Sequence, residues 1–434
     1  MKSLLIRAED KNIWEKRASI VPEDLKLILE ETGAKGYIEK SEKRFFTEDA
    51  YEAAGAQACE GMEKGEVIFG VKEIPEEKIL DDKTYIFFSH TIKGQSSGMP
   101  LLKKIMDSNA TLIDYEKITD DKNRRLIYFG RYAGDAGAID ILRLMGEYWA
   151  HHGIDTPFKA CKPAHQYTSV ADAKVHISKI GETIKSQGLP AKLSPMVIGV
   201  LGYGNVSGGA QQIFDCLPTQ RIAPGDLNAF VEKGDFDPRT VYVSVFKEED
   251  LVANKEGKAF ELQEYYDHPE RFESKFEQYM PAISVLVNAV YWDKQYPRFV
   301  TWENLKRLYE KQESPRFCGI ADITCDTHGS IECNVKSTDS GLPAYLVNPL
   351  TQAVTDGHKG DGIVVLAVDN LPCEVPNDSS TFFSNQLKPF VANILEADYA
   401  SSLDESGLCP EIKKAVIVYN GHLTPGYEYL RKFL

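Results

Sequence analysis

The stretch VIGVLGYGNVSGGAQQIF, residues 197–214, decides the fold. It opens with five apolar residues, which run directly into the tripeptide GYG at 202–204. The segment after the glycines has helical composition, with apolar residues at 210, 213 and 214 spaced to face a sheet. The pattern predicts a strand, a tight turn and a helix.

This turn is a candidate site for the pyrophosphate of a dinucleotide, which binds the free N–H groups of a helix's first turn. Gly202 permits the tight turn, and a Cβ at Gly204 would block the ligand's approach. The third glycine is Gly208, one residue later than in the common fingerprint, so that Ser207 stands where glycine or alanine is usual. Small residues there let the helix pack closely on the sheet. Turns of this composition also occur without a ligand, so the flanking strand and helix are what favour a nucleotide site. The residues expected to bind the coenzyme here are Gly202, Gly204, Asn205, Val206 and Ser207.

The residues after the next strand bear on which coenzyme binds. NAD-binding proteins carry an Asp or Glu there that holds the ribose 2′-hydroxyl. In this sequence no acid occurs until Asp226, and Arg221 precedes it. The missing acid favours NADPH over NADH, with Arg221 as the partner of the 2′-phosphate. Arg221 fits a solvated surface charge equally well.

Composition limits the class of protein. At 434 residues, 43% of them hydrophobic, the chain is long enough for two domains with substantial cores. It has no run of 18 apolar residues and no signal-peptide pattern, so we expect no membrane partner and a cytoplasmic location. The mitochondrial matrix stays open if a transit peptide has been removed. A net charge of −15 argues against a nucleic-acid partner.

The eight cysteines give no sign of a metal site. None of them forms a C-x-x-C pair, and the group at 318, 325 and 333 lacks a convincing pattern of histidine partners. We therefore expect reduced, mostly buried thiols and no bound metal.

Ionisable residues follow three predicted strands, at 67–71, 84–88 and 111–115, just past the end of each. Parallel α/β sheets bind ligands beyond those ends, so we expect these side chains to converge on one place. Taken singly, each fits a solvated loop charge or a structural histidine. The residues are Lys72, Glu73, His90, Lys93 and Glu116.

Further along the chain, residues 22–33 predict a helix with an acidic first turn and a glycine stop. Residues 124–137 predict a strand and a glycine-broken turn, with a long helix from 139. We place the first domain boundary at that turn, and the helix at 382–395 returns to the first domain. The expected domains are 1–135 with 377–434, and 136–376.

Seven motifs, in order along the chain, identify a resemblance to a known family. Nearly the whole chain resembles the lysine-2-oxoglutarate reductase part of α-aminoadipic semialdehyde synthase and, more distantly, lysine-forming saccharopine dehydrogenases and alanine dehydrogenases. The motifs are SHTIK (89–93), LIDYE (112–116), YAGDAG (132–137), GYGNVSGGAQ (202–211), YDHPERF (266–272), CDTHGSIE (325–332) and VDNLP (368–372).

The resemblance implies an α/β fold of two Rossmann-like domains with a cleft between them. The domain built from both chain ends binds the substrate, and the other binds the dinucleotide. The implied reaction joins L-lysine to 2-oxoglutarate and reduces the imine with NADPH to saccharopine. The resemblance leaves open a homo-oligomer, and also a glutamate-forming saccharopine dehydrogenase as a partner or fused domain.

The resemblance also implies residue roles. Lys72 and His90 match an acid–base pair, and we expect Lys72 to take the proton from the lysine ammonium, although the two roles can be exchanged. A lowered pKa at Lys72 would need burial or a nearby cation, such as Lys93 or Arg17. The remaining assignments are Glu73 and Glu116 as tuning charges, Arg17, Lys93 and Arg125 at the substrate carboxylates, and Asp326 near the nicotinamide.

Two other functions compete with this one. An alanine-dehydrogenase-like enzyme would use the same lysine, histidine and aspartate on ammonia and pyruvate. Asp326 also fits a plain turn residue before Gly329. A module that binds NADP(H) without chemistry is the second alternative, and the combination of Lys72, His90, Glu73 and Glu116 weighs against it.

Overall fold

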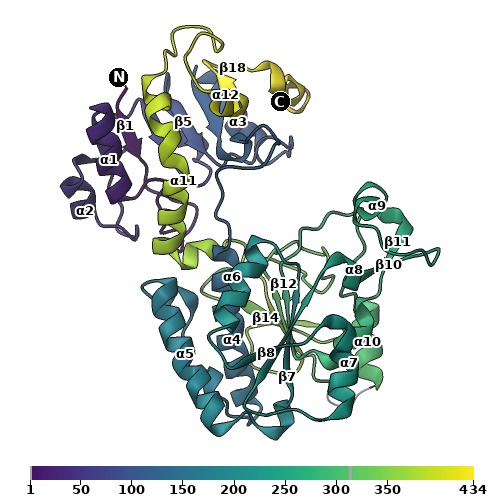
Figure 1. Ribbon diagram of the computed structural model, residues 1–434. Coiled ribbons are helices and arrows are strands. Elements are labelled where there is room, and N and C mark those ends of the chain that lie inside the picture. Colours follow the sequence, from purple (N-terminus) through teal and green to yellow (C-terminus); the bar gives the residue numbers. More distant parts are fainter. Residues whose placement is uncertain (1, 312–314) are drawn as a thin grey trace. The chain divides into compact units, whose positions relative to one another are not determined.

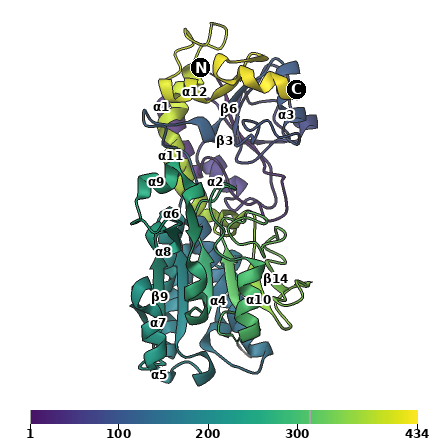
Figure 2. The same ribbon diagram turned by 90° about the vertical axis from the view of Figure 1, so that its right-hand side faces the viewer.

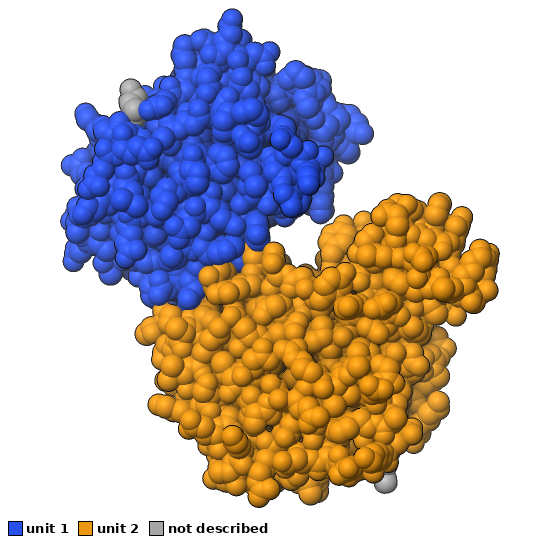
Figure 3. Space-filling view, in the orientation of Figure 1, with its two compact units in different colours: residues 1–129, 376–434 blue, residues 130–375 orange. Residues whose placement is uncertain are grey.

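A computed structural model describes residues 2–311 and 315–434, and every element named below lies in these ranges. The chain divides into two compact units (Figure 3). Unit 1 comprises residues 1–129 and 376–434, and unit 2 comprises residues 130–375. The first and last parts of the sequence therefore build one unit together.

The described residues of unit 1 form an eight-stranded sheet in the order β18-β17-β6-β5-β4-β1-β2-β3. The six strands from β6 to β3 run parallel, and β17 and β18 add antiparallel pairs at one edge. The strands are β1 (Leu4–Ile6), β2 (Gly36–Glu39), β3 (Ala56–Cys59), β4 (Val67–Phe69), β5 (Thr84–Phe87), β6 (Thr111–Asp114), β17 (Val416–Tyr419) and β18 (His422–Leu423).

The helix predicted at 22–33 is confirmed by α1 (Pro22–Thr32). Pro22 stands at its start, acidic residues fill its first turn, and Gly33 ends it with a φ of +67°. Proline is pre-set for the first helical position and glycine for the left-handed cap, so the ends are fixed locally. The other α-helices of unit 1 are α2 (Glu48–Ala53), α3 (Met99–Asp107), α11 (Pro376–Glu396) and α12 (Pro410–Ala415).

The last part of the chain is tied into unit 1 by α11, which packs against α1 in both views (Figures 1 and 2). Asp24 of α1 accepts hydrogen bonds from Ser384 Oγ and Lys388 Nζ, each at 2.6 Å. The backbone N–H groups of Ala18 and Val21 donate to serines of α11 at 3.0 and 3.1 Å. These buried polar contacts fix α11 as an integral part of unit 1.

The described residues of unit 2 form a second eight-stranded sheet, in the order β15-β14-β16-β13-β12-β7-β9-β8. It is parallel from β16 to β8, and β14 and β15 are antiparallel. The two mostly parallel sheets confirm the α/β class. The strands are β7 (Met196–Leu201), β8 (Thr219–Arg221), β9 (Val241–Phe246), β12 (Val285–Asn288), β13 (Gly319–Asp322), β14 (Ala344–Val347), β15 (Val354–Asp356) and β16 (Ile363–Leu366), with β10 (Val252–Asn254) and β11 (Phe272–Ser274) forming a separate ribbon.

Helices cover both faces of this sheet. Figure 1 shows α4 (Tyr132–His151) and α6 (Asn205–Phe214) on one face and α7 (Pro224–Lys233) and α10 (Trp302–Lys311) on the other. On the second face, Leu227 and Leu305 join a core cluster with strand residues such as Ile320. The remaining α-helices are α5 (Val170–Gln187), α8 (Glu248–Leu251) and α9 (Leu262–Asp267). No α-helix in the described part of the chain is both long enough and apolar enough to span a bilayer.

Residues 124–137 differ from the expected strand and turn. The segment before 132 forms a single isolated bridge, Thr119 with Arg125, and the YAGDAG motif is the first part of α4. The expected domain boundary, between 135 and 136, therefore lies inside a helix. The glycines serve close packing, because a Cβ at Gly134 would lie 1.8 Å from the Val206 carbonyl oxygen of α6. A Cβ at Gly209 of α6 would likewise lie 2.1 Å from the Arg131 carbonyl oxygen.

Gly208 has a different environment from its neighbour. A Cβ built on it meets no described atom within 4 Å, so the third glycine of the motif is not the one that needs close packing. The glycine of α6 that lies close to a neighbouring element is Gly209, and that element is the start of α4. Ser207, in contrast, is fully buried.

Gly134→Ala is expected to lower the free energy of unfolding by about 2 kcal/mol or more, because the added methyl group cannot fit beside α6. Gly208→Ala is the matched control. It adds the same methyl group to a helix in open space and should raise stability by up to about 1 kcal/mol. Urea unfolding of both variants measures the difference, and equal stabilities would contradict the packing argument.

Candidate active site

The predicted strand, turn and helix at 197–214 are confirmed by β7, which leads through Gly202 into α6. Gly202 has a φ of +90°, a backbone conformation that favours glycine, and Gly204 is the N-cap of α6. A Cβ at Gly204 would meet no described atom within 4 Å, so this position faces open space. No described side chain caps the helix, whose first turn is formed by Asn205, Val206 and Ser207. The backbone N–H groups of these three residues can donate hydrogen bonds to an anion.

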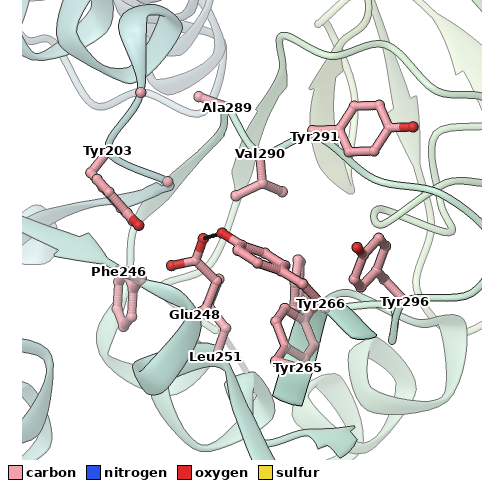
Figure 4. Close-up of a pocket in the computed structure, with 13 residues that line it drawn as sticks. Tyr203, Phe246, Glu248, Leu251, Tyr265, Tyr266, Ala289, Val290, Tyr291 and Tyr296 are labelled. Atoms are coloured by element: carbon pink, nitrogen blue, oxygen red, sulfur yellow. Dashed lines mark hydrogen bonds between the residues drawn. The ribbon is translucent and has the colours of Figure 1, made fainter. Parts of the chain in front are cut away.

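A pocket of about 430 Å³ opens beside this turn (Figure 4). Its walls come from the carboxyl ends of β7, β9 and β12 and from α8 and α9, which is where parallel α/β sheets bind ligands. Aromatic side chains dominate the lining. The lining residues are Gly202, Tyr203, Gly204, Phe246, Glu248, Leu251, Tyr265, Tyr266, Ala289, Val290, Tyr291, Tyr296 and Phe299.

Glu248 brings a carboxylate into this pocket. It follows β9 by two residues, and its Oε1 accepts a hydrogen bond from the Tyr266 hydroxyl at 3.0 Å. The negative charge of Glu248 also raises the pKa of the Tyr203 hydroxyl. Figure 4 shows the carboxylate between the rings of Tyr203 and Tyr266.

Arg221 does not line the pocket. Its guanidinium binds Asp215 at 2.7 Å and Gln211 Oε1 at 2.5 Å. It belongs to β8, which is the outermost strand and pairs with β9, while β9 itself pairs with β7. The strand beside β7 is thus the third of this unit along the chain and not the second. A sequence rule that counts residues from the glycines therefore examines the wrong strand.

Asp326 lies in the exposed turn after β13, where its carbonyl oxygen accepts from the Gly329 N–H at 2.8 Å. It is not among the residues that line the pocket. Asp322 is a buried carboxylate at this end of the sheet, and it accepts hydrogen bonds from Asn288 at 2.8 Å and Asn334 at 2.7 Å. Burial raises the pKa of Asp322, and these hydrogen bonds oppose the rise. Asp322 therefore holds the ends of β12 and β13 together.

In unit 1, the ionisable residues follow parallel strands that lie side by side. Lys72 and Glu73 follow β4, His90 follows β5 and Glu116 follows β6. All four consequently lie along one edge of the sheet. His90 has a φ of +52°, a conformation that is uncommon for residues other than glycine.

His90 and Glu73 form an ion pair between Nδ1 and Oε1. Burial raises the pKa of Glu73, but the hydrogen bond and charge of His90 outweigh burial and lower that pKa to about 2. Lys11 approaches the other carboxylate oxygen at 3.6 Å. Glu73 therefore remains ionised at neutral pH and can orient the imidazole ring.

The backbone of Lys72 is held by buried charges. Its N–H donates to Glu9 Oε2 at 2.9 Å, and its carbonyl oxygen accepts from Arg7 Nη1 at 3.3 Å. Burial lowers the pKa of the Lys72 amine, and the positive charges of Arg17 and Lys11 lower it further. The combination of burial and neighbouring cations is what a catalytic amine requires near neutral pH.

Arg17 is buried, with 2% of its surface exposed. Its Nε and Nη2 grip the two oxygens of Glu15 at 2.8 and 2.6 Å, and its guanidinium lies 4.0 Å from the centre of the Phe129 ring. The Nε/Nη2 side of the guanidinium is thus bound to Glu15. Arg17 acts on Lys72 through its charge.

The remaining predicted residues of unit 1 are nearer the solvent. Arg125 is exposed and forms an ion pair with Glu116, which is half-buried. Lys93 is exposed in the turn after β5 and is not among the main causes of the lowered pKa of Lys72. Arg125 and Lys93 are cations that a dissolved anion can reach.

Sequence reasoning missed Lys11, Glu15 and Glu248. The first two lie in the irregular segment between β1 and α1, where no periodic pattern marks a position. Glu248 lies just past the end of β9, and the rule that ionisable residues gather at strand ends would have found it.

Comparisons with protein families match both parts of the chain. Residues 5–136 match the family model "Alanine dehydrogenase/PNT, N-terminal domain", and residues 247–426 match "Alanine dehydrogenase/PNT, C-terminal domain".

Curated relatives align over nearly the whole chain. The α-aminoadipic semialdehyde synthase of Arabidopsis thaliana is 37% identical over 98% of this chain and 41% of its own length. The mitochondrial enzyme of the same name from Mus musculus is 34% identical over 99% of this chain and 47% of its own length. This chain thus spans less than half the length of these relatives. The saccharopine dehydrogenase [NAD(+), L-lysine-forming] of Candida albicans is 27% identical, covering 91% of this chain and 92% of its own.

Solved structures share the fold. An L-alanine dehydrogenase aligns with a TM-score of 0.61 and 15% identity over 99% of this chain and 100% of its own. A transhydrogenase from Sinorhizobium meliloti aligns with a TM-score of 0.56 and 12% identity over 98% of this chain and 100% of its own. At these identities the likeness is one of architecture.

Proposed function

We propose that this chain, which belongs to the alanine dehydrogenase/PNT family, condenses L-lysine with 2-oxoglutarate and reduces the resulting imine to saccharopine. The observation that carries the proposal is the cluster of Lys72, Glu73 and His90 along one sheet edge. The alignment over 98% and 99% of the chain with two α-aminoadipic semialdehyde synthases supports the choice of substrates.

We assign the nicotinamide coenzyme to unit 2. The open space at Gly204 and the uncapped first turn of α6 fit a pyrophosphate. The adjoining pocket, lined by aromatic side chains, fits the rest of a dinucleotide. When bound, the reduced nicotinamide supplies the hydride. We assign lysine and 2-oxoglutarate to unit 1.

The amine of Lys72 is assigned as the base. Lysine's ε-ammonium must lose a proton before its nitrogen can attack the keto carbon of 2-oxoglutarate. Because its pKa is lowered, Lys72 is neutral, and able to accept that proton, at a lower pH than an ordinary lysine.

His90 is assigned as the acid. It donates a proton to the carbonyl oxygen as the carbon–nitrogen bond forms. It then takes up the proton that the new carbinolamine nitrogen loses, and returns this proton to the hydroxyl group that leaves as water. The Glu73 carboxylate holds the imidazole ring by its Nδ1, which leaves Nε2 to face the substrate.

Arg125 and Lys93 are assigned to the substrate carboxylates, because a guanidinium or ammonium group in reach of solvent can bind them. Arg17 shares that expectation, but its grip on Glu15 favours a role in lowering the pKa of Lys72. Glu116 then controls where the Arg125 guanidinium lies. Asp326 remains a candidate for the nicotinamide side of the reaction.

The sequence argument for NADPH rests on the missing acid before Asp226, after β8. In this sheet the strand beside β7 is β9, and an acid, Glu248, does follow it. The strand that bears on the choice of coenzyme is therefore β9, and NADPH as the coenzyme stays a prediction.

The saccharopine formed has to be consumed by a second oxidoreductase. We propose a glutamate-forming saccharopine dehydrogenase, acting as a partner or as a fused domain. The length of the α-aminoadipic semialdehyde synthases beyond the matched region supports this proposal.

Oxidation of reduced nicotinamide by the purified chain is expected to require both 2-oxoglutarate and lysine. Ammonia should not replace lysine, and pyruvate with ammonia should give no rate. Absorbance of the reduced coenzyme measures the rate, and mass spectrometry identifies saccharopine. A rate with pyruvate and ammonia would instead favour an alanine-dehydrogenase-like enzyme. Coenzyme binding without turnover of either substrate pair would favour a non-catalytic module.

A further inference from the structure

The turn that carries His90 is held in an unusual backbone conformation. His90 has a φ of +52°, and a residue other than glycine keeps such a conformation only where its surroundings enforce it. The His90 side chain is exposed, whereas Ser89 and Thr91 on either side of it are buried. The backbone of His90 is therefore fixed from the protein interior through its two neighbours.

Both neighbours belong to one hydrogen-bonded network that ends at Asp114. The Ser89 hydroxyl donates to Oδ2 of Asp114, and the Ser89 N–H donates to the same oxygen at 3.0 Å. The hydroxyl and the N–H of Thr91 lie 2.8 and 3.3 Å from the Ser89 hydroxyl oxygen. Because the single hydroxyl proton of Ser89 goes to the carboxylate, Thr91 is the donor in both contacts. The network thus connects the residues before and after His90 to one carboxylate.

The other oxygen of Asp114 holds a second turn of the proposed site. Its Oδ1 accepts the N–H of Glu116 at 2.8 Å, and the Glu116 carboxylate forms the ion pair with Arg125. Asp114 ends β6, Ser89 follows β5, and these two strands pair in parallel. The Asp114 side chain is fully buried. One buried carboxylate therefore ties the turn after β5 to the turn after β6.

This position requires a carboxylate because the groups that contact it are donors. Two N–H groups and one hydroxyl point at the two oxygens of Asp114. An asparagine of the same size would present one oxygen and would turn its own NH₂ group toward a donor. A buried donor that loses its acceptor costs free energy, so the turns would have to shift.

We propose that Asp114, acting through Ser89, is a positioning residue that sets the place of the His90 imidazole for proton transfer. The inference rests on the proposed function for the role of His90 as the acid. It adds the buried group that determines where this acid lies. Proton transfer requires a heavy-atom distance of about 3 Å, so a small displacement of the turn is enough to slow the reaction.

Ser89→Ala tests this inference while leaving Asp114 in place. The variant loses the hydroxyl link but keeps the backbone N–H bond to the carboxylate. We expect kcat with lysine and 2-oxoglutarate to fall by about tenfold, because a misplaced acid transfers its proton slowly. The KM for 2-oxoglutarate and the affinity for the coenzyme should stay unchanged, since the contact of Asp114 with Glu116 is kept.

Ser108→Ala is the matched control for this variant. Ser108 is buried in the same unit, and its hydroxyl has no hydrogen-bond partner among the described residues. Removing that hydroxyl should leave turnover unchanged. A loss in Ser108→Ala equal to the loss in Ser89→Ala would mean that any buried serine of unit 1 has this effect, and it would overturn the inference.

Asp114→Asn releases both turns at once. We expect kcat to fall by more than about tenfold, and the KM for 2-oxoglutarate to rise as well, because Glu116 no longer holds Arg125 in place. Thermal unfolding shows whether each variant keeps its fold. If Asp114→Asn does not fold, Ser89→Ala decides the question alone.

A double-mutant cycle separates positioning from a general structural role. In His90→Gln the imidazole is absent, so Ser89→Ala has no acid left to displace, and the double variant should be as active as His90→Gln alone. Losses that multiply, or a Ser89→Ala variant as fast as the unchanged chain, would overturn the inference. Both results leave the proposed reaction standing, because the unchanged chain still forms saccharopine. An unchanged chain that forms no saccharopine would overturn the inference and the proposed function together.

Discussion

Lys72→Met is expected to lower turnover by about 10² or more while leaving coenzyme affinity nearly unchanged. The variant keeps the length and apolar stem of the side chain but removes the amine that takes the proton from lysine. Burial and two nearby cations lower the pKa of this amine. The thioether of methionine carries no exchangeable proton, so the variant cannot act as a base. Steady-state kinetics with lysine and 2-oxoglutarate measures turnover, and fluorescence titration measures the affinity for the coenzyme.

The pH dependence distinguishes a base from a merely structural lysine. A base works when neutral, so kcat/KM should fall as the pH drops below the pKa of Lys72. Lys11→Met removes a cation that lowers this pKa. The pKa should therefore rise, and the acid limb of the profile should move to higher pH. If Lys72→Met weakens coenzyme binding as much as turnover, or if the acid limb stays in place in Lys11→Met, the assignment of Lys72 as base fails.

His90→Gln should also reduce turnover by about 10², the scale of lost proton transfer. Glutamine can still donate a hydrogen bond to Glu73, so the local geometry is kept while the exchangeable proton is lost. His422→Gln is the matched control, because His422 is exposed in the edge strand β18, which β17 and β6 separate from β5. Equal losses in both variants would mean that a histidine-to-glutamine change harms unit 1 in general. A His90→Gln variant with unchanged turnover would remove His90 from the mechanism.

Much of the fold was predictable because local signals fixed it. In the turn at 202–204, Gly202 adopts a positive φ and Gly204 leaves open space at the start of α6. Glycine is the residue that meets both requirements, so the sequence alone indicates the turn. The ends of α1 follow from Pro22 and Gly33 in the same way. Alternation of strands with helices then places the charges after β4, β5 and β6 on one edge.

Strand order was not predictable from local signals. Chain order suggested that β8 lies beside β7, whereas hydrogen bonding puts β9 there. Residues 132–137 were misread for a related reason, since glycines that allow two helices to touch look the same in sequence as glycines in a turn.

The candidate site was predictable at the level of its strand ends. Lys72, Glu73 and His90 were found because each follows an apolar run. Lys11 was missed, and the ion pair of Arg17 with Glu15 was not foreseen, because those residues lie in the irregular segment between β1 and α1. What such residues touch depends on distant parts of the chain.

The attachment of α11 to α1 also has a consequence for the order of events on the ribosome. The segment 130–375 is continuous, so its sheet can be completed as soon as residue 375 has emerged. Unit 1 still lacks α11, β17 and β18 at that moment. Asp24 therefore has neither of its hydrogen-bond donors on α11, Ser384 and Lys388. The unit whose first part is translated first is therefore the unit that is completed last. A nascent chain stalled when residue 375 has just emerged from the ribosome should resist protease only in residues 130–375.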